Sequence, residues 1–408
     1  KYISTTSDTY TLCAKSEYKE GYFCADQDSG GISRTSTAAM FGDWGAGGGS
    51  SNEDWLAGYT TRRKITIDQT KVDEDLADFP VLVKLTSANF DFSEANDDGY
   101  DIRFTASDGL TLLSYEREQH DSVSEEAEYW VKVPSVSGTV DTEIYIYYTT
   151  TVTADGAEPE SVWDENYVMV QHMKDNTTSA TLDSTGNNND GTKGSANNPL
   201  EADGKIGKGQ TYDVNSEKIS TGDVLSFEYN EPFSVEAWAS NTTDNVYGML
   251  ACKDRHYNHY SPYYRGWYLW KWNSAYGHTL VLDLMNDGDQ PYLVRVKGST
   301  ALNDTTLRHL SSTYSGSGIA SGVKLYVNGE LETMTTQTDN LGGRTILPVG
   351  GSFNIGNRDD ASFFGAGWIG IIDEVRISNI VRSAEWLKAS YNSGNDTLLT
   401  CGDEEILP

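Results

Sequence analysis

The sequence predicts an all-β protein built of tandem β-sandwiches. Short runs of alternating apolar and polar residues recur along it, clusters of Gly, Asn, Asp and Ser separate these runs, and long stretches of helical periodicity are nearly absent. Many short strands with few helices bury their apolar faces by stacking one sheet on another. With 408 residues, the chain has the length of about two to three domains.

Charge and hydropathy exclude two kinds of partner. The chain has 30 Lys and Arg against 61 Asp and Glu, a formal net charge of −31. Nucleic acids and anionic membrane surfaces are bound by basic residues, so we expect no nucleic-acid partner and no membrane-surface helix. No apolar run approaches the roughly 18–20 residues that cross a bilayer, so we also expect no membrane span in this chain. The composition favours an acidic, extracellular protein.

The first elements are a small N-terminal piece, residues 1–44, and a linker, residues 45–54, of Gly/Ser-rich composition. Four cysteines allow three disulfide pairings: Cys13, Cys24, Cys252 and Cys401. Cys13 and Cys24 have ten residues between them and are expected to close a local loop. A Cys252–Cys401 bridge would then close a loop of about 150 residues, and both bridges would imply an oxidising compartment.

Residues 55–165 are predicted to form the first β-sandwich. Five alternating runs read as strands: residues 64–67, 81–85, 101–104, 129–133 and 143–148. Turn residues separate the runs, for example Asn-Asp-Asp-Gly at residues 96–99.

Residues 166–395 are predicted to form the second sandwich, followed by a C-terminal tail, residues 396–408. Asn328-Gly329 lies between two alternating runs and predicts a type I′ hairpin, because both residues tolerate positive φ. Ser383 predicts the N-cap of a short helix over residues 384–391.

Four motifs of the second sandwich carry a resemblance to a known family: residues 182–191 (LDSTGNNNDG), 233–238 (FSVEAW), 323–329 (VKLYVNG) and 372–379 (IDEVRISN). In order and spacing they resemble the laminin-G-like, concanavalin A-like jelly-roll modules of bacterial and archaeal surface proteins. One departure is Leu-Arg-His-Leu at residues 307–310, where the family usually shows Trp-His-His-Val.

Two further segments resemble known families. Residues 62–67 (RRKITI), 101–105 (DIRFT), 130–134 (WVKVP), 144–148 (IYIYY) and 162–164 (VWD) resemble a family of unknown function that often precedes such a module. This resemblance implies a domain boundary near Glu165 and a cell-surface context. Residues 10–13 (YTLC) and 21–26 (GYFCAD) resemble the disulfide-closed loop of type IV pilin-like heads; the alternative is a short disulfide-stapled appendage.

The densest aromatic stretch, residues 256–272, is the candidate ligand site. Its second half alternates, so Tyr268, Trp270 and Trp272 share one face and Trp267 and Leu269 the other, and one of these faces must belong to the core. Exposed aromatic rings suit the C–H faces of sugars. The candidate ligand-binding residues are Tyr257, Tyr260, Tyr263, Tyr264, Trp267 and Trp270. The alternative is that the tyrosines pack over the rim of the jelly roll or against a neighbouring subunit.

A loop rich in side-chain oxygens suggests a structural calcium ion, which similar modules commonly hold. The candidate ligands are Asp183, Asn187 and Asn189, with Asp373 from the last core strand. The alternative is an Asx-turn loop that bonds its own backbone.

Catalysis is not expected, so the protein is predicted not to be an enzyme. The paired acids on one strand face that glycoside hydrolysis requires are missing, and the adjacent Asp373 and Glu374 are expected to point to opposite faces. The leading interpretation is a non-enzymatic, extracellular surface or pilus-associated protein whose lectin-like jelly roll contacts a glycan or a surface protein. The alternatives are a filament subunit, which would self-assemble, and an accessory module of a secreted carbohydrate-active enzyme or a cryptic hydrolase.

Overall fold

The computed structural model describes residues 54–407 except 149–151, 176–178, 195–197, 215, 243–246, 257–263, 288–290, 349 and 359–366. Of residues 1–53 it describes the backbone of four strands, and the side chains of His256, Tyr264, Asp287 and Pro291 also lie outside the described set. The chain divides into two compact units, one of residues 1–53 with Pro408 and one of residues 54–407. The prediction of an all-β protein of stacked sheets is confirmed.

The N-terminal unit contains a four-stranded antiparallel sheet, in the order β1 (Tyr2–Thr6), β2 (Thr9–Lys15), β3 (Tyr22–Asp26), β4 (Ile32–Thr35). The register of β2 and β3 pairs Cys13 directly with Cys24. Directly opposite residues of an antiparallel pair have Cα atoms about 4.5–5.5 Å apart, which is within the range of a disulfide. The Cys13–Cys24 bridge stays a prediction, because the side chains of this unit are outside the described set. Residues 45–53 of the predicted linker, residues 45–54, lie outside the described residues, so the linker also stays a prediction.

The first sandwich of the larger unit has two sheets. Its three-stranded sheet has the order β6 (Leu76–Thr86), β10 (Glu126–Val136), β9 (Tyr115–Asp121). Its five-stranded sheet has the order β29 (Leu399–Ile406), β5 (Thr61–Ile67), β11 (Thr142–Tyr148), β7 (Arg103–Ala106), β8 (Leu112–Leu113). A short helix, α1 (Pro159–Val162), follows.

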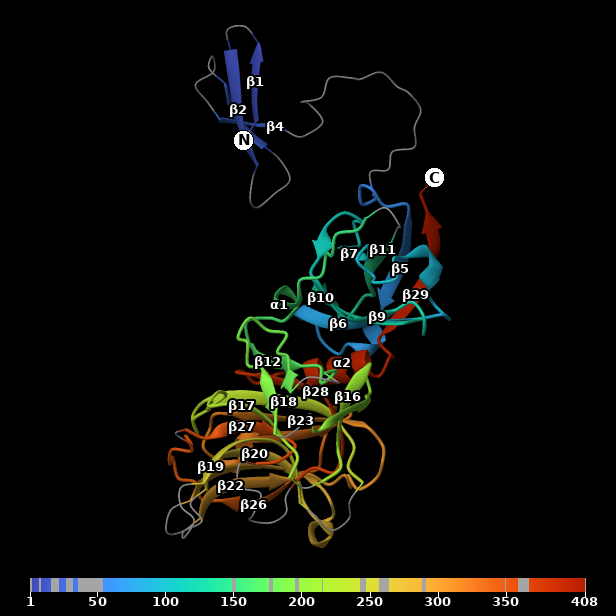
Figure 1. Ribbon diagram of the computed structural model, residues 1–408. Helices are drawn as coiled ribbons and strands as arrows, with labels where there is room; N and C mark the ends of the chain where they lie inside the picture. Colours follow the sequence, from blue (N-terminus) through green and yellow to red (C-terminus); the bar gives the residue numbers. More distant parts are fainter. Residues whose placement is uncertain are drawn as a thin grey trace. The chain divides into compact units, whose positions relative to one another are not determined.

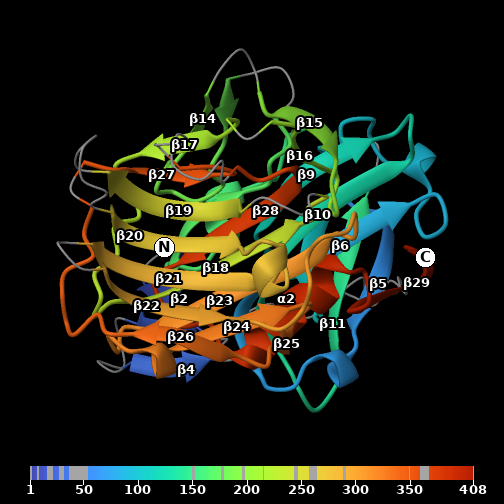
Figure 2. The same ribbon diagram turned by 90° about the horizontal axis from the view of Figure 1, so that it is seen from below.

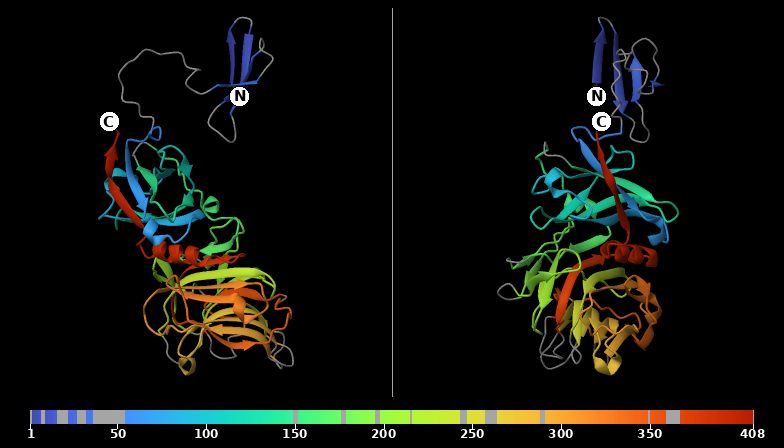
Figure 3. Two further views of the ribbon diagram at one scale, coloured as in Figure 1. Left: turned by 180° about the vertical axis from the view of Figure 1, so that it is seen from behind. Right: turned by 90° about the vertical axis from the view of Figure 1, so that its right-hand side faces the viewer.

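The C-terminal segment is part of the first sandwich, which corrects the expectation of a tail at residues 396–408. Strand β29 pairs with β5 along its length, and Arg62 on β5 bonds Glu405 on β29 at 2.7 Å. Figure 3 shows the red β29 running beside the blue β5. The last strand of the chain therefore completes the sheet that the first strand of this unit begins.

The second sandwich consists of two larger sheets. The eight-stranded sheet has the order β15 (Leu200–Asp203), β16 (Lys208–Tyr212), β28 (Gly370–Ser378), β18 (Pro232–Ala239), β23 (Arg308–Ser315), β24 (Val323–Val327), β25 (Glu330–Leu331), and β12 (Tyr167–Gln171) pairs with β28. The nine-stranded sheet has the order β13 (Ala180–Thr181), β14 (Gly191–Lys193), β17 (Ile219–Gly222), β27 (Ser352–Ile355), β19 (Gly248–His256), β20 (Tyr264–Lys271), β21 (Leu280–Asp287), β22 (Pro291–Lys297), β26 (Thr335–Asp339). Figure 2 shows the nine-stranded sheet with β27, β19, β20, β21, β22 and β26 side by side.

Two local predictions in this sandwich are confirmed. Asn328 and Gly329 have φ of 53° and 75° and join β24 to β25, as a type I′ hairpin requires. The helix α2 (Ala384–Gly394) begins after Ser383, whose side chain accepts a hydrogen bond from the Trp386 amide at 3.1 Å.

The two sandwiches are joined by a shared core. Trp238, Tyr326 and Trp386, from the second sandwich and α2, are buried in the same apolar cluster as the interior of the first sandwich. The guanidinium of Arg382, just before α2, donates two hydrogen bonds of 2.7 Å to the carboxylate of Asp164. Figure 1 shows α2 and β28 between the two sandwiches. Because apolar and charged groups both cross this junction, the sandwiches form one compact unit.

The predicted Cys252–Cys401 bridge is absent, which is a second correction. Neither cysteine is in a disulfide: Cys252 is buried on β19 of the nine-stranded sheet, and Cys401 lies on β29 of the first sandwich. Because β29 pairs with β5, its thiol is built into a different sandwich from that of Cys252.

No helix in the part of the chain that the structure describes has the length and hydropathy of a membrane span.

Candidate functional site

The outer face of the nine-stranded sheet carries an aromatic cluster. Along β20 the side chains alternate as predicted: Trp267 and Leu269 are fully buried in the core between the sheets, whereas Tyr268 and Trp270 belong to a separate cluster that also contains Trp272. The alternation of β20 therefore divides its aromatic rings between the core and the opposite face.

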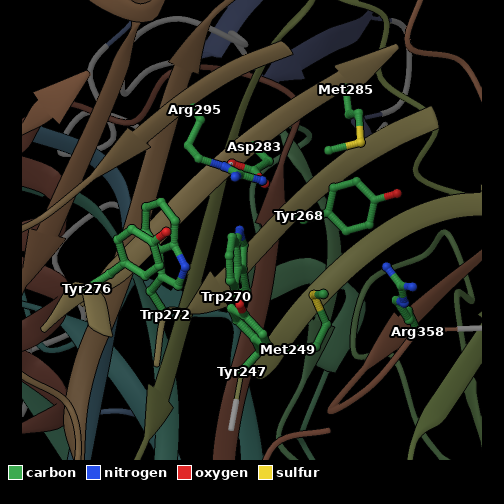
Figure 4. Close-up of a pocket in the computed structure, with 10 residues that line it drawn as sticks. All are labelled: Tyr247, Met249, Tyr268, Trp270, Trp272, Tyr276, Asp283, Met285, Arg295 and Arg358. Carbon is green, nitrogen blue, oxygen red and sulfur yellow. Dashed lines mark hydrogen bonds and ion pairs between the residues drawn. The ribbon is translucent and has the colours of Figure 1, made fainter. Parts of the chain in front are cut away.

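These outward aromatics line a pocket of about 230 Å³, which we call the aromatic pocket. Figure 4 shows the ten side chains that line it: Tyr247, Met249, Tyr268, Trp270, Trp272, Tyr276, Asp283, Met285, Arg295 and Arg358. They come mainly from the neighbouring strands β19, β20, β21 and β22 and from the segments next to them. A continuous sheet thus supplies the rigid floor of the pocket.

The rings of the pocket contact one another. Trp270 and Trp272 have centroids 5.5 Å apart, and Tyr247 lies 5.5 Å from Trp270. Tyr276 stacks on Trp272 with a centroid distance of 3.8 Å and an interplanar angle of 17°, and it is the exposed member of that stack. Packing of this kind holds each ring in one orientation, which leaves a preformed apolar surface.

A partly buried ion pair provides the polar edge of the pocket. Arg295 on β22 lies directly opposite Asp283 on β21 and donates to both of its carboxylate oxygens, at 2.8 and 2.6 Å. Burial raises the pKa of the Asp283 carboxyl, and Arg295 and the indole N–H of Trp270 oppose this effect. The Arg295 guanidinium also lies 5.3 Å from the Trp270 ring. The pair is bidentate, so its two charges are fixed and cancel each other.

Two buried polar atoms of the pocket have no hydrogen-bond partner, the hydroxyl of Tyr268 and the indole nitrogen of Trp270. The hydroxyl of Tyr268 can both donate and accept. The side chain is 4% exposed, and its oxygen is buried without a hydrogen-bond partner. Burial raises the pKa of Tyr268 well above its ordinary value, so the hydroxyl stays protonated at neutral pH and can donate. A buried hydroxyl without a partner is costly, and a ligand hydroxyl in the pocket would supply that partner.

The predicted ligand residues have different outcomes. Tyr257, Tyr260 and Tyr263 lie outside the described residues, as does the side chain of Tyr264. Trp270 lines the aromatic pocket. The assignment of Trp267 to the ligand site was wrong, because its side chain is fully buried between the sheets, with its ring centroid 5.1 Å from that of Phe233.

Sequence reasoning missed the polar edge of the pocket. The signal was present, because Asp283 and Arg295 are single charged residues inside otherwise apolar strands, LVLDLM and YLVRV. A charge at such a position is expected to have a partner. Their cross-strand pairing depends on the register of β21 and β22, which the sequence alone does not give.

The predicted calcium loop bonds its own backbone. The carboxylate of Asp183 accepts from the amides of Val170, Thr185 and Asn189 at 2.8–3.0 Å and from the Thr185 hydroxyl. The side-chain amides of Asn187 and Asn189 donate to main-chain oxygens of β12. These bonds match the alternative to a calcium site, an Asx-turn loop whose side chains bond the backbone.

The fourth calcium candidate is held elsewhere. One carboxylate oxygen of Asp373, on β28, accepts from the amides of Lys205 and Ile206. Calcium at these four residues stays a prediction.

The expectation that Asp373 and Glu374 point to opposite faces is wrong. A β-bulge interrupts the pairing of β28 with β18 at this point, and Glu374 has a φ of 52°. Ile372 and Val375 both face the core, so the two acids between them both face outward, toward the first sandwich. The bulge inserts an extra residue, which turns two neighbouring side chains to one side.

Comparison with known families defines the class of the second sandwich. Residues 213–388 match the family described as the concanavalin A-like lectin/glucanases superfamily. The C-terminal part of the chain is therefore a concanavalin A-like domain. Residues 98–188 match a domain of unknown function, DUF2341, so the chain joins these two kinds of domain, as the resemblances indicated. Both matches lie outside residues 1–44, and the resemblance of that piece to a pilin-like head gains no support from them.

No curated protein matches the chain. Several solved structures resemble it at low identity. They include the binding domain of Paraclostridial Mosquitocidal Protein 1 (14% identity, 56% of this chain and 52% of that chain covered, TM-score 0.42). Domain 4 of AbnA, a GH43 extracellular arabinanase from Geobacillus stearothermophilus in complex with arabinotriose, has 20% identity, covers 57% and 98%, and has a TM-score of 0.39. The binding domain of botulinum neurotoxin serotype G has 14% identity, covers 55% and 50%, and has a TM-score of 0.39. The matches span about half of the first and third of these proteins, and at this similarity they carry no argument about a ligand.

Proposed function

We propose that this protein is a non-enzymatic, extracellular adhesion protein that holds an uncharged glycan in the aromatic pocket of its jelly roll. The observation that carries the proposal is the combination of fixed aromatic faces with the buried, unpartnered hydroxyl of Tyr268. A sugar presents apolar C–H faces and hydroxyl groups, and the pocket offers a surface for each. At about 230 Å³, the pocket is smaller than the roughly 300–1,000 Å³ of sites for drug-sized ligands, which fits one terminal sugar ring.

Charge favours an uncharged glycan. The Asp283–Arg295 pair contributes no net charge to the pocket, and Arg358 is the remaining charged residue of its lining. The oxygens and N–H groups of these residues can bond sugar hydroxyls. The whole chain has a net charge of −31, which repels anionic sugars at long range.

The acids near the pockets support binding rather than hydrolysis. Cleavage of a glycosidic bond uses two carboxyl groups that flank it. Among the ten residues that line the aromatic pocket, Asp283 is the only acid, and Arg295 occupies both of its oxygens. A second pocket of about 520 Å³ at the junction of the sandwiches is lined by five acids, Glu116, Glu158, Glu160, Asp175 and Asp183. The oxygens of its two acids Glu116 and Asp183 all accept hydrogen bonds from the protein.

The extracellular location is supported by the strand pairing of the N-terminal unit. Cys13 and Cys24 face each other across β2 and β3, which suits a disulfide formed in an oxidising compartment. Protein purified and then unfolded without a reducing agent is expected to show two thiols, from Cys252 and Cys401. Four thiols would contradict this location.

A glycan array with the full chain tests the proposal, followed by titration of each hit with tryptophan fluorescence as the readout. We expect neutral glycans to bind and Trp270→Ala and Trp272→Ala to weaken binding by about 30-fold. Tyr100→Ala, an exposed tyrosine of the first sandwich, is the matched control and should bind as wild type does. Failure of every neutral glycan, or equal binding by Trp270→Ala, would overturn the glycan proposal, and release of reducing ends from a bound glycan would overturn the non-enzymatic part.

A further inference from the structure

The junction of the two sandwiches contains a buried cluster of acids around one histidine. Glu116 and Glu118 lie on β9, where a β-bulge interrupts its pairing with β10, and the carboxylates of both reach His172. His172 follows β12 directly, and Glu374 lies on β28. Glu118, His172 and Glu374 are 5%, 3% and 1% exposed. Three separate strands, one from the first sandwich and two from the second, therefore bring these groups together.

The ligand-type atoms of this cluster converge on His172. Its Nδ1 lies 2.6 Å from Glu374 Oε1 and 3.5 Å from Glu118 Oε2, and its Nε2 lies 3.1 Å from Glu116 Oε2. One ligand atom each from Glu118, His172 and Glu374 all lie within 4.8 Å of one another. This is the one such group of three or more His, Cys, Asp or Glu in the part of the chain that the structure describes.

Neighbouring side chains fix the carboxylates. The Trp130 indole donates to Glu118 Oε2 at 2.8 Å, and the Trp163 indole donates to Glu116 Oε2 at 2.9 Å. Arg376 donates to Glu374 Oε2 at 2.5 Å, which leaves Oε1 of that residue facing His172. Metal sites in proteins typically have such outer partners, which orient the ligands.

Four carboxyl groups lie in this buried region beside one guanidinium: those of Glu116, Glu118, Glu374 and the adjacent Asp373, with Arg376. Oε1 of Glu118 and Oδ1 of Asp373 are buried without hydrogen-bond partners. Buried polar atoms without a partner are costly, and a bound cation would supply a partner for such an oxygen.

We propose that this junction binds a divalent transition-metal cation through His172, Glu118 and Glu374. An imidazole with carboxylates suits Zn²⁺ or Mn²⁺, whereas Ca²⁺ takes six to eight oxygen ligands. The junction pocket of about 520 Å³, which Glu116, His172 and Ser184 help to line, provides a route from solvent. Ligand atoms about 2.0–2.1 Å from a tetrahedral metal lie roughly 3.3 Å apart, so His172 and Glu374 must separate by less than about 1 Å. A neutral His172 that binds the cation through Nδ1 carries its hydrogen on Nε2, which lies 3.1 Å from Glu116 Oε2.

The cation would clamp the two sandwiches together, because its ligands come from both. Metal bound only by the folded state stabilises that state by mass action. The junction lies on the eight-stranded sheet, whereas the aromatic pocket lies on the nine-stranded one, so this proposal is independent of glycan binding.

The test uses the untagged full chain, freed of metal with a chelator and dialysed. We expect isothermal titration and elemental analysis to give one equivalent of Zn²⁺ or Mn²⁺ per chain, and the melting temperature to rise with the metal. Co²⁺ should give visible absorption bands typical of a histidine–carboxylate site. No stoichiometric binding of any of these ions, or an unchanged melting temperature with saturating Zn²⁺ and Mn²⁺, would overturn the proposal.

Variants assign the site to these residues. Glu118→Gln and Glu374→Gln should weaken metal affinity at least ten-fold. Glu128→Gln is the matched control, because Glu128 is also a buried strand glutamate but lies beside Lys84, at 3.6 Å, and should leave affinity unchanged. Wild-type affinity in both Glu118→Gln and Glu374→Gln would contradict the assignment. If a variant does not fold, the Co²⁺ spectrum of the wild type decides whether a histidine is a ligand.

Discussion

Replacing Tyr268 by Phe removes one oxygen atom and tests the central feature of the aromatic pocket. The hydroxyl is buried and has no partner in the protein, so its loss should not weaken the fold. An unsatisfied buried polar group costs roughly 1–3 kcal/mol, and we expect the free energy of unfolding of Tyr268→Phe to equal that of the wild type or to exceed it by about 1 kcal/mol. In a unit of this size, that gain raises the melting temperature by about 1–2 °C.

The same change should weaken glycan binding. A hydrogen bond between uncharged groups contributes about 0.5–1.5 kcal/mol, so losing the one from Tyr268 should raise Kd by roughly two- to twelve-fold. Urea unfolding measures the first effect, and titration of tryptophan fluorescence with the glycan measures the second. Tyr100→Phe, on the exposed surface of the first sandwich, should change neither quantity. A clear loss of stability with unchanged Kd would refute the reasoning, because it would mean that the hydroxyl bonds the protein and not the ligand.

Three other predictions follow from the structure. Trp267→Ala should lower the free energy of unfolding in urea by roughly 3–5 kcal/mol, because the Trp267 ring is fully buried. Trp270→Ala should chiefly reduce glycan affinity, by about 30-fold. If the two variants changed stability and affinity equally, their placement on opposite faces of β20 would be contradicted. Burial alone would raise the pKa of Asp164, but its bonds to Arg382 outweigh burial and hold the pKa below 3.8. A carboxyl whose pKa is lower in the folded than in the unfolded protein stabilises the fold at pH values above its unfolded pKa, and this stabilisation is lost as the pH falls through the folded pKa. Asp164→Asn should therefore lower the free energy of unfolding by roughly 3 kcal/mol at pH 6 and by progressively less below about pH 4. A loss of stability in urea unfolding that does not change with pH would exclude this ion pair as its cause. Deleting residues 399–408 should expose the edge of β5 and lower the melting temperature of the first sandwich, and an unchanged melting curve would show that β29 contributes nothing to it.

The sequence determined the features that depend on near neighbours in the chain. Alternation of apolar residues fixed which face of β20 each aromatic ring occupies, although it could not say which face was the core. The Asn328-Gly329 pair fixed a hairpin, because only a few residues accept positive φ at both positions. Ser383 fixed the start of α2 through a hydrogen bond three residues away. Each of these signals acts within a few residues, so it can be read without knowing the rest of the fold.

The tertiary structure alone decided which distant residues meet. The C-terminal segment became β29 because β5 had an unpaired edge, and the same pairing kept Cys401 away from Cys252. The bulge at Asp373 and Glu374 turned two neighbouring acids to one side, and the meeting of β9, β12 and β28 placed His172 among them. The physical reason is that strand order, register and bulges are set by packing over the whole sheet, and a shift of one residue reverses the face of every side chain that follows.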